Sequence, residues 1–196
     1  MYRGRYRNGE NDMKKKMMTV LLAVCMMLMA TACGGGATFE AGSFDGTTYT
    51  NTSVGIKATM PEGFSSIEST AVTGITYEAV VQAEDGSAIQ IIAEDMKQTI
   101  GRAVSAKTYL DSMKTQVDSQ YGAMGLTTEV SDLGTVKIGG KDFSGISIAI
   151  TGGVQGLTQE YYINKVGDVM FCIIVTATDD KAATLDQFIS SIEAAE

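Results

Sequence analysis

The sequence predicts an α+β domain in which an antiparallel β-sheet is sandwiched between helices, an α/β/α sandwich, after a signal peptide and a flexible tether. Runs rich in β-forming residues follow one another, separated by short turns that contain Gly. Two other segments carry apolar residues at helical spacing. The segment Val169–Thr178 is apolar at odd and even positions alike. Such a strand must be covered on both faces, and the two helices are expected to cover it.

The N-terminal part of the chain has the order of a secretory signal. Lys14, Lys15 and Lys16 precede an apolar run, Met17–Met29, which ends in small residues and a cysteine. The run is shorter than the 20 or so residues that span a bilayer. Residues 1–32 are therefore expected to be an N-terminal extension plus a signal peptide. The first twelve residues match no part of a signal, so Met13 is expected to be the true start.

The end of this segment, Ala30-Thr31-Ala32-Cys33, resembles the lipobox of bacterial lipoproteins. The commonest lipobox has Leu where Ala30 stands here. The resemblance implies cleavage between Ala32 and Cys33 and attachment of diacylglycerol to Cys33. Two acyl chains are enough for stable membrane attachment. We therefore expect a lipid-anchored protein on the extracytoplasmic face of the cell membrane; a plain cleaved signal is the alternative.

The chain after the predicted cleavage site is strongly acidic. It has 164 residues, which suits one domain, with 9 basic and 21 acidic residues and a net charge of −12. Nucleic acid is excluded as an expected partner, because affinity for phosphates comes from Lys and Arg. Anionic lipid headgroups should also repel the domain, so the lipid on Cys33 rather than surface charge would hold it at the membrane.

Residues 33–46 are expected to be the lipidated cysteine and a flexible linker, because Gly and small polar residues dominate. Residues 47–196 are expected to form a single globular domain. Its first strands are predicted at Thr47–Asn51 and Val54–Met60. Pro61-Glu62-Gly63 then predicts a turn, since Pro fixes φ and Gly allows positive φ.

The next elements are a hairpin and a helix. Strands are predicted at Ile75–Gln82 and Ser87–Ala93, joined by a turn at Glu84-Asp85-Gly86. A helix is predicted over Ser105–Tyr121, with Ser105 as its N-cap. One apolar stripe recurs along it at steps of three and four residues: Leu110, Met113, Val117 and Tyr121.

The last third of the chain predicts an antiparallel meander and a C-terminal helix. The expected strands are Thr127–Asp132, with an extension to Ile138 left open, Lys141–Thr151, Leu157–Val166 and Val169–Thr178. The helix is expected over Lys181–Ala195, with a fraying last turn. Its buried stripe would be Leu185, Phe188, Ile189 and Ile192.

The order of these elements, together with two sequence segments, resembles that of domains with the PsbP-like fold, which is named for an extrinsic protein of photosystem II. The two segments are Val54-Gly55-Ile56 with Met60-Pro61-Glu62-Gly63-Phe64, and Gln159-Glu160-Tyr161-Tyr162 with Gly167-Asp168. The resemblance covers roughly Tyr49 to Ala195. It implies an antiparallel sheet between helices and a role as an adaptor or assembly factor.

No segment carries a recognisable catalytic motif. The chain has no histidine, which excludes Cys-His and the usual Ser-His catalysis. Cys172 lies in a continuously apolar run and is expected to be buried. Glycine-rich segments at 134–141 and 152–156 lie between strands and are interpreted as turns, not phosphate-binding loops.

No metal site or cofactor is expected. Asp179 and Asp180, with Asp186, could hold Ca²⁺ through carboxylate oxygens. Capping of the C-terminal helix already explains the first two, so the interpretation without a metal is preferred.

The neighbouring residues Tyr161 and Tyr162 form the candidate binding surface. Neighbours on a strand face opposite sides of a sheet, so one tyrosine can fill the core while the other is exposed. Exposed tyrosines are typical of binding surfaces. Packing of both under helices is the competing interpretation, and the one we favour.

These observations predict a membrane-anchored, non-enzymatic binding or adaptor lipoprotein with an unknown protein or small-molecule partner. Two alternatives stay open. One is a small envelope hydrolase that uses carboxylates or a Ser-Lys pair, which would need a polar cleft where two titratable groups converge. The other is a structural or assembly factor of an envelope complex.

Overall fold

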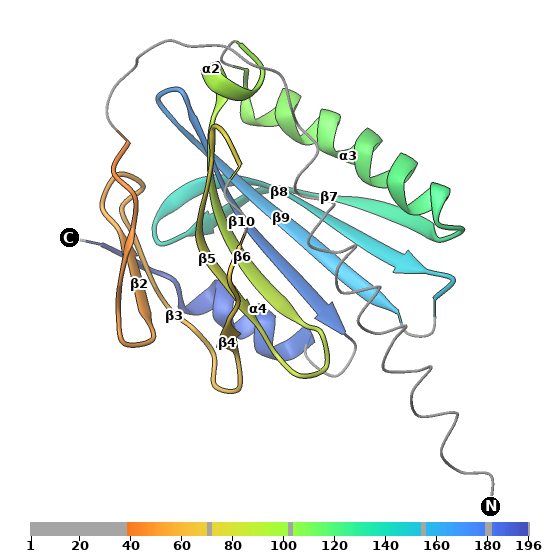
Figure 1. Ribbon diagram of the computed structural model, residues 1–196, viewed down its shortest axis with the longest axis horizontal. Helices are drawn as coiled ribbons and strands as arrows, with labels where there is room; N and C mark the ends of the chain where they lie inside the picture. Colours follow the sequence, from red (N-terminus) through yellow and green to blue (C-terminus); the bar gives the residue numbers. More distant parts are fainter. Residues whose placement is uncertain (1–38, 70–71, 102–103, 154–155, 179–181, 196) are drawn as a thin grey trace, which may run out of the picture.

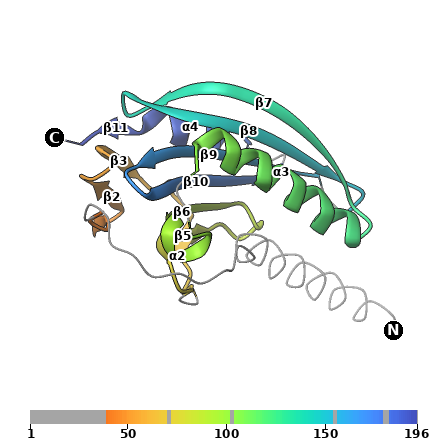
Figure 2. The same ribbon diagram turned by 90° about the horizontal axis from the view of Figure 1, so that it is seen from above.

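The computed structural model describes residues 39–69, 72–101, 104–153, 156–178 and 182–195. These residues form two antiparallel sheets with helices packed on the larger one (Figures 1 and 2). In chain order the elements are β1 Ser43–Asp45, β2 Thr48–Asn51, β3 Ile56–Thr59, β4 Ser65–Ser66, β5 Ile75–Gln82, β6 Ala88–Asp95, α2 Met96–Thr99, α3 Ala106–Ala123, β7 Thr127–Ile138, β8 Lys141–Thr151, β9 Leu157–Val166, β10 Val169–Thr178, α4 Ala182–Ser191 and β11 Glu193–Ala194.

The larger sheet has seven strands in the order β4-β5-β6-β10-β9-β8-β7. The strands predicted from the β5–β6 hairpin and from the meander are confirmed, and β7 takes the longer of its two predicted extents. A β-bulge interrupts the β7–β8 register between Asp132 and Gly134. The strand β10 lies at the centre of the sheet, as its lack of polar alternation predicts.

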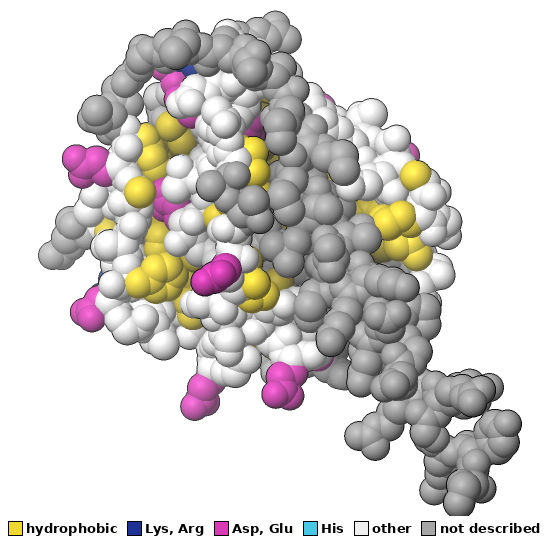
Figure 3. All heavy atoms as spheres, in the orientation of Figure 1, with side chains coloured by type: hydrophobic (Ala, Val, Ile, Leu, Met, Phe, Trp, Pro, Cys, Tyr) yellow, Lys and Arg dark blue, Asp and Glu magenta, His cyan; other side chains and the backbone are white. Residues whose placement is uncertain are grey.

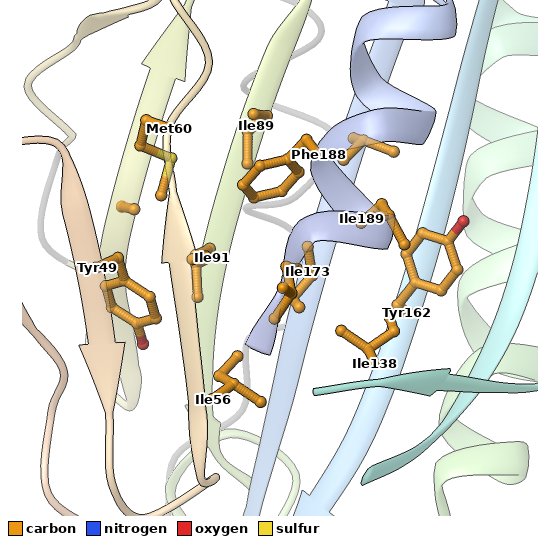
Figure 4. Packing of buried hydrophobic residues seen from close by; sticks show 14 of the residues in the cluster. Tyr49, Ile56, Met60, Ile89, Ile91, Ile138, Tyr162, Ile173, Phe188 and Ile189 are labelled. Carbon is orange, nitrogen blue, oxygen red and sulfur yellow. The ribbon is translucent and has the colours of Figure 1, made fainter. Parts of the chain in front are cut away.

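Both faces of β10 are buried, which confirms the expectation for this strand. Met170, Cys172 and Ile174 face the core under α3. Phe171 and Ile173 face the opposite core, with α4 and the smaller sheet (Figure 4). The buried position predicted for Cys172 is therefore confirmed.

The helix α3 forms where its cap and stripe predict it. The Ser105 side chain accepts a hydrogen bond from the Thr108 backbone N–H, 3.1 Å away, which satisfies one of the helix's first backbone donors. The predicted apolar stripe is buried and is joined by Tyr109. On the outer face, Lys107 lies 3.2 Å from Asp111, one of the i,i+4 pairs that the sequence favours.

The C-terminal helix is shorter than predicted. α4 ends at Ser191, and β11 then pairs with β3, so the expected fraying helical turn is wrong. Glu193 lies opposite Lys57 in this pair, and opposite charges across two strands are favourable. The backbone N–H of Ala195 also donates to the Gly55 carbonyl at 3.1 Å.

The expected flexible linker is also shorter than predicted, because its last residues are folded. β1 pairs with β2, and the ring of Phe39 lies 6.3 Å from that of Phe171 in the core. The smaller sheet, β1-β2-β3-β11, thus begins inside the segment predicted as linker, residues 33–46. Local composition did not indicate the contact of Phe39, because Phe171 lies far along the chain, whereas β1 is held by a hairpin with the neighbouring β2.

The fold is mostly β, and helices alone do not enclose the sheet. α3 covers one face, whereas α4 shares the other face with Tyr49 and Ile56 of the smaller sheet and with Met60, which directly follows β3 (Figure 4). The expectation of a sheet sandwiched between helices is therefore corrected on this second face. Within the described ranges, no helix has the length and apolar character needed to cross a membrane.

Candidate binding surface

Neither tyrosine of the predicted surface is exposed. Tyr161 is fully buried, and its hydroxyl donates to Gln159 Oε1 at 3.0 Å. Tyr121 of α3 donates to the same oxygen at 3.1 Å, and Gln159 Nε2 donates to Thr176 at 3.2 Å. This buried network connects α3 to β9 and β10, so Tyr161 stabilises the packing of α3 on the sheet.

Tyr162 points to the opposite face and is only 6% exposed, packed beside Ile189 of α4 (Figure 4). Its hydroxyl donates to Glu160 at 2.6 Å. Burial, together with this bond, raises the pKa of Tyr162 well above its ordinary value. The favoured interpretation, in which both tyrosines pack under helices, is confirmed, because Tyr161 lies in the core under α3 and Tyr162 in the core under α4. The alternative of an exposed tyrosine surface is wrong.

A buried carboxylate lies on the α3 face. Glu94 of β6 is 2% exposed, and its Oε2 accepts a hydrogen bond from the Tyr109 hydroxyl. Its Oε1 is buried with no hydrogen-bond partner in the described part of the chain. Burial raises the pKa of Tyr109, and the neighbouring Cys172 and Glu94 add to the effect.

A second carboxylate, Glu78 of β5, ties the smaller sheet to the larger one. Its Oε2 accepts hydrogen bonds from the Tyr49 hydroxyl, from Asn51 Nδ2 at 2.9 Å and from the Gly42 backbone N–H at 3.1 Å. Burial, and then the bond to Glu78, raises the pKa of Tyr49. We call Gly42, Tyr49, Asn51 and Glu78 the Glu78 cluster.

These carboxylates do not converge on a reaction site. Glu94 contacts α3 on one face of the sheet, whereas Glu78 contacts the smaller sheet on the other. Each accepts a hydrogen bond from a tyrosine of another element, so each pair holds two elements together. In the described ranges, no three Cys, Asp or Glu side chains gather in a way that could hold a metal ion.

The glycine-rich segment 134–141 forms a turn only in part, because residues 134–138 belong to β7 and Lys141 begins β8. Gly139 and Gly140 form the β7–β8 turn, both with positive φ. Gly139 has a second reason to lack a side chain, because a Cβ there would lie 2.8 Å from the Glu193 carbonyl oxygen of β11. The segment 152–156 connects β8 to β9, although residues 154–155 lie outside the described residues.

The candidates for anchoring and two of the three for metal binding also lie outside the described residues. Ala32 and Cys33 of the predicted cleavage site belong to this group, as do Asp179 and Asp180. Asp186, the third metal candidate, is described and is exposed on α4.

The most accessible backbone of the larger sheet is its edge strand β7. Among the described residues, β7 pairs with β8 alone, so its other side is a free edge. The free edges β1, β4 and β11 have only two or three residues, whereas β7 has twelve. Nine of these twelve are exposed. A long exposed edge presents unpaired N–H and C=O groups that can bind another strand.

The side chains of β7 combine acidic and apolar groups. Val130 is 38% exposed and Leu133 is 36% exposed, unusually high for large apolar residues in this domain. Glu129 is exposed beside Val130, and Asp132 accepts a hydrogen bond from the Gly134 N–H at the bulge. Lys137 is the basic residue of the strand, but it lies beyond the bulge and pairs with Asp142 at 2.5 Å.

The tyrosine pair in the sequence gives no indication of the free edge at β7. A pattern that could have found it is present: Thr127–Ile138 is long and β-forming but polar at odd and even positions alike. Such a pattern indicates a strand with little burial on either face, which is typical of a sheet edge.

The comparisons with known proteins give a fold and no family. No protein-family model matches the chain, and no curated protein matches it. The solution structure of cyanobacterial PsbP (CyanoP) from Synechocystis sp. PCC 6803 matches with a TM-score of 0.50 and 15% identity, covering 83% of this chain and 97% of that one. This chain has a PsbP-like fold.

A crystal structure from Bacteroides thetaiotaomicron VPI-5482 also matches, with a TM-score of 0.43 and 17% identity, covering 74% of this chain and 46% of that one. At these identities the likeness concerns the fold, and the function must be argued from this chain's own residues.

Proposed function

We propose that this chain is a membrane-anchored, extracytoplasmic lipoprotein that acts as a non-enzymatic binding or adaptor module. The main support for this proposal is that two carboxylates of the chain are engaged in contacts between elements, whereas the edge strand β7 is exposed and, in the described part of the chain, unpaired on one side. The carboxylates of Glu78, which is partly buried, and Glu94, which is buried, bond to tyrosines on opposite faces of the sheet, which suits a structural role. The exposed twelve-residue edge β7 suits recognition of another molecule.

Two further observations support the proposal. The sequence from Lys14 to Cys33 has the order of a lipoprotein signal. The net charge of −12 after Cys33 argues against attachment by surface charge to anionic lipid, so a lipid on Cys33 would supply the membrane affinity.

The proposal is tested by crosslinking on intact source cells, with wild type compared with Cys33→Ser. The expected result is a crosslinked partner and recovery in the membrane fraction for wild type, with release or loss of processing for Cys33→Ser. Retention of processed Cys33→Ser in the membrane would overturn the lipid anchor. Absence of any crosslinked partner for the anchored wild type would overturn the adaptor role.

A further inference from the structure

We propose that the free edge of β7, over Thr127–Asp132, binds an extended partner strand that carries basic residues. The inference rests on the proposed adaptor function and adds a surface and a partner chemistry to it. The backbone of an edge strand recognises an extended chain because its unpaired N–H and C=O groups match those of another strand.

The bulge defines which part of β7 is available. It falls between Asp132 and Gly134, where the regular ladder to β8 shifts register. A bulge twists a strand and disfavours continuous pairing beyond it. The six residues before it form an unbroken ladder with β8 and equal a typical strand in length.

The charges of this segment identify the partner as basic. Glu129 and Asp132 are exposed, and Asp118 of α3 adds a third carboxylate at this edge by accepting a hydrogen bond from Thr128 at 2.6 Å. Figure 3 shows another side of the domain, over β4 and β5, and there too Asp and Glu stand out while Lys and Arg are scarce, so the acidic character extends beyond this edge. A cationic strand is favoured by this field, and a second copy of this acidic chain is repelled.

The alternation of side chains gives the partner a pattern. Successive side chains of a strand point to opposite faces, so Glu129 and Asp132, three positions apart, lie on different faces. Val130 shares the α3-side face with Asp132 because its register partner Ile148 lies in the core under α3. An antiparallel partner would place basic residues opposite Glu129 and Asp132, three positions apart, with an apolar residue opposite Val130.

The test uses a fluorescent synthetic peptide of about ten residues, a length typical of strands. Its core reads lysine, threonine, valine, lysine, and its binding to the full chain in detergent is followed by anisotropy. Two control peptides accompany it. One has glutamate in place of each lysine, and the other keeps every side chain but carries N-methyl groups on alternate backbone nitrogens. We expect the unmodified peptide to bind at least about tenfold more tightly than either control, since a tenfold change needs only about 1.4 kcal/mol.

Protein variants locate the binding. Glu129→Lys should lower the affinity for the unmodified peptide several-fold. Glu62→Lys makes an equal charge change at an exposed turn and should leave that affinity unchanged. Hydrogen exchange should show protection of the 127–132 amides on binding. Equal binding of the N-methylated peptide, protection elsewhere, or no binding would overturn the proposal. A dimer of the peptide-free chain protected at β7 would assign the edge to a second copy and would also overturn it.

These outcomes are separate from those of the adaptor proposal. If crosslinking in cells captures a partner on another surface, the adaptor role stands and the β7 site fails. If the peptide binds β7 but cells show neither anchoring nor a partner, the edge chemistry stands and the proposed function fails.

Discussion

Tyrosine hydroxyls bonded to carboxylates form two of the polar contacts between elements in the described part of this protein. Tyr109 with Glu94 and Tyr49 with Glu78 each join elements that are distant in the sequence. A buried carboxylate needs such donors, since an acceptor left without a partner costs about 1–3 kcal/mol. Loss of either tyrosine hydroxyl should therefore lower the free energy of unfolding.

Tyr109→Phe should lower the free energy of unfolding by about 1–3 kcal/mol, because it removes the donor to buried Glu94. The measurement is urea unfolding at neutral pH. Tyr161→Phe is the matched control. Its acceptor, Gln159 Oε1, keeps the hydrogen bond from Tyr121, so a smaller loss is expected. An equal loss in both variants would contradict a special role for the Tyr109–Glu94 contact.

At the scale of elements, β10 is central because it has no polar face. Ile173→Asp and Ile174→Asp should both unfold the domain, because the two side chains enter different cores. Each loses about 1.5–3 kcal/mol of apolar burial and also buries a charge. Circular dichroism against temperature measures the outcome.

Thr76→Asp, on the exposed face of β5, is the control for these two variants and should change the melting temperature little. Parent-like melting of either isoleucine variant would show that one face of β10 is not enclosed.

The Glu78 cluster predicts a second effect at this scale. A Cβ at Gly42 would lie 2.3 Å from the Tyr49 ring, so Gly42→Ala should displace β1 and the chain before it. We expect a loss of about 1–3 kcal/mol, as for other overpacked sites. Amide exchange over Ser43–Asn51 should also become faster.

Gly122→Ala is the control, because a Cβ there meets nothing within 4 Å and the residue is helical. That variant should be neutral or more stable by up to about 1 kcal/mol. Unchanged exchange in Gly42→Ala would mean that the N-terminal residues are not held by Tyr49.

At the scale of the whole molecule, three buried tyrosines link stability to alkaline pH. Burial raises the pKa values of Tyr49, Tyr109 and Tyr162 in the folded protein. Above a pH of about 10 the unfolded chain releases these protons while the folded protein keeps them. Stability should therefore be intact below that pH and fall above it, by up to about 1.4 kcal/mol per pH unit for each tyrosine.

Urea unfolding at a series of pH values measures this slope, and tyrosinate absorbance in the same samples shows when ionisation occurs. Tyr162→Phe should make the slope shallower, since it removes one of the three groups. Ionisation of all tyrosines near their ordinary pKa, with native circular dichroism retained, would contradict the prediction.

Local patterns allowed much of this fold to be predicted. Ile146, Ile148 and Ile150 alternate along β8, and Ser105 caps α3, so the information lies in neighbouring residues. The strands β1 and β4, with three and two residues, are too short to show a strand pattern. The short strand β11 could not be predicted, because its partner β3 lies far along the chain. The candidate surface was misplaced for a related reason: the burial of Tyr161 and Tyr162 depends on where α3 and α4 pack.

The folded start of the domain limits how far it can stand from a membrane. Five residues separate Cys33 from Phe39, and an extended chain advances at most about 3.6 Å per residue. The linker therefore allows a distance of at most about 20 Å between Cys33 and Phe39. If Cys33 is lipidated, the smaller sheet lies close to the bilayer surface. The start of β7 lies at the opposite end of the domain (Figures 1 and 2). When the domain stands end-on to the membrane, a strand bound there lies about one domain diameter, on the order of 40 Å, above that sheet. In that orientation the domain can reach partners whose extracytoplasmic parts project well clear of the lipid.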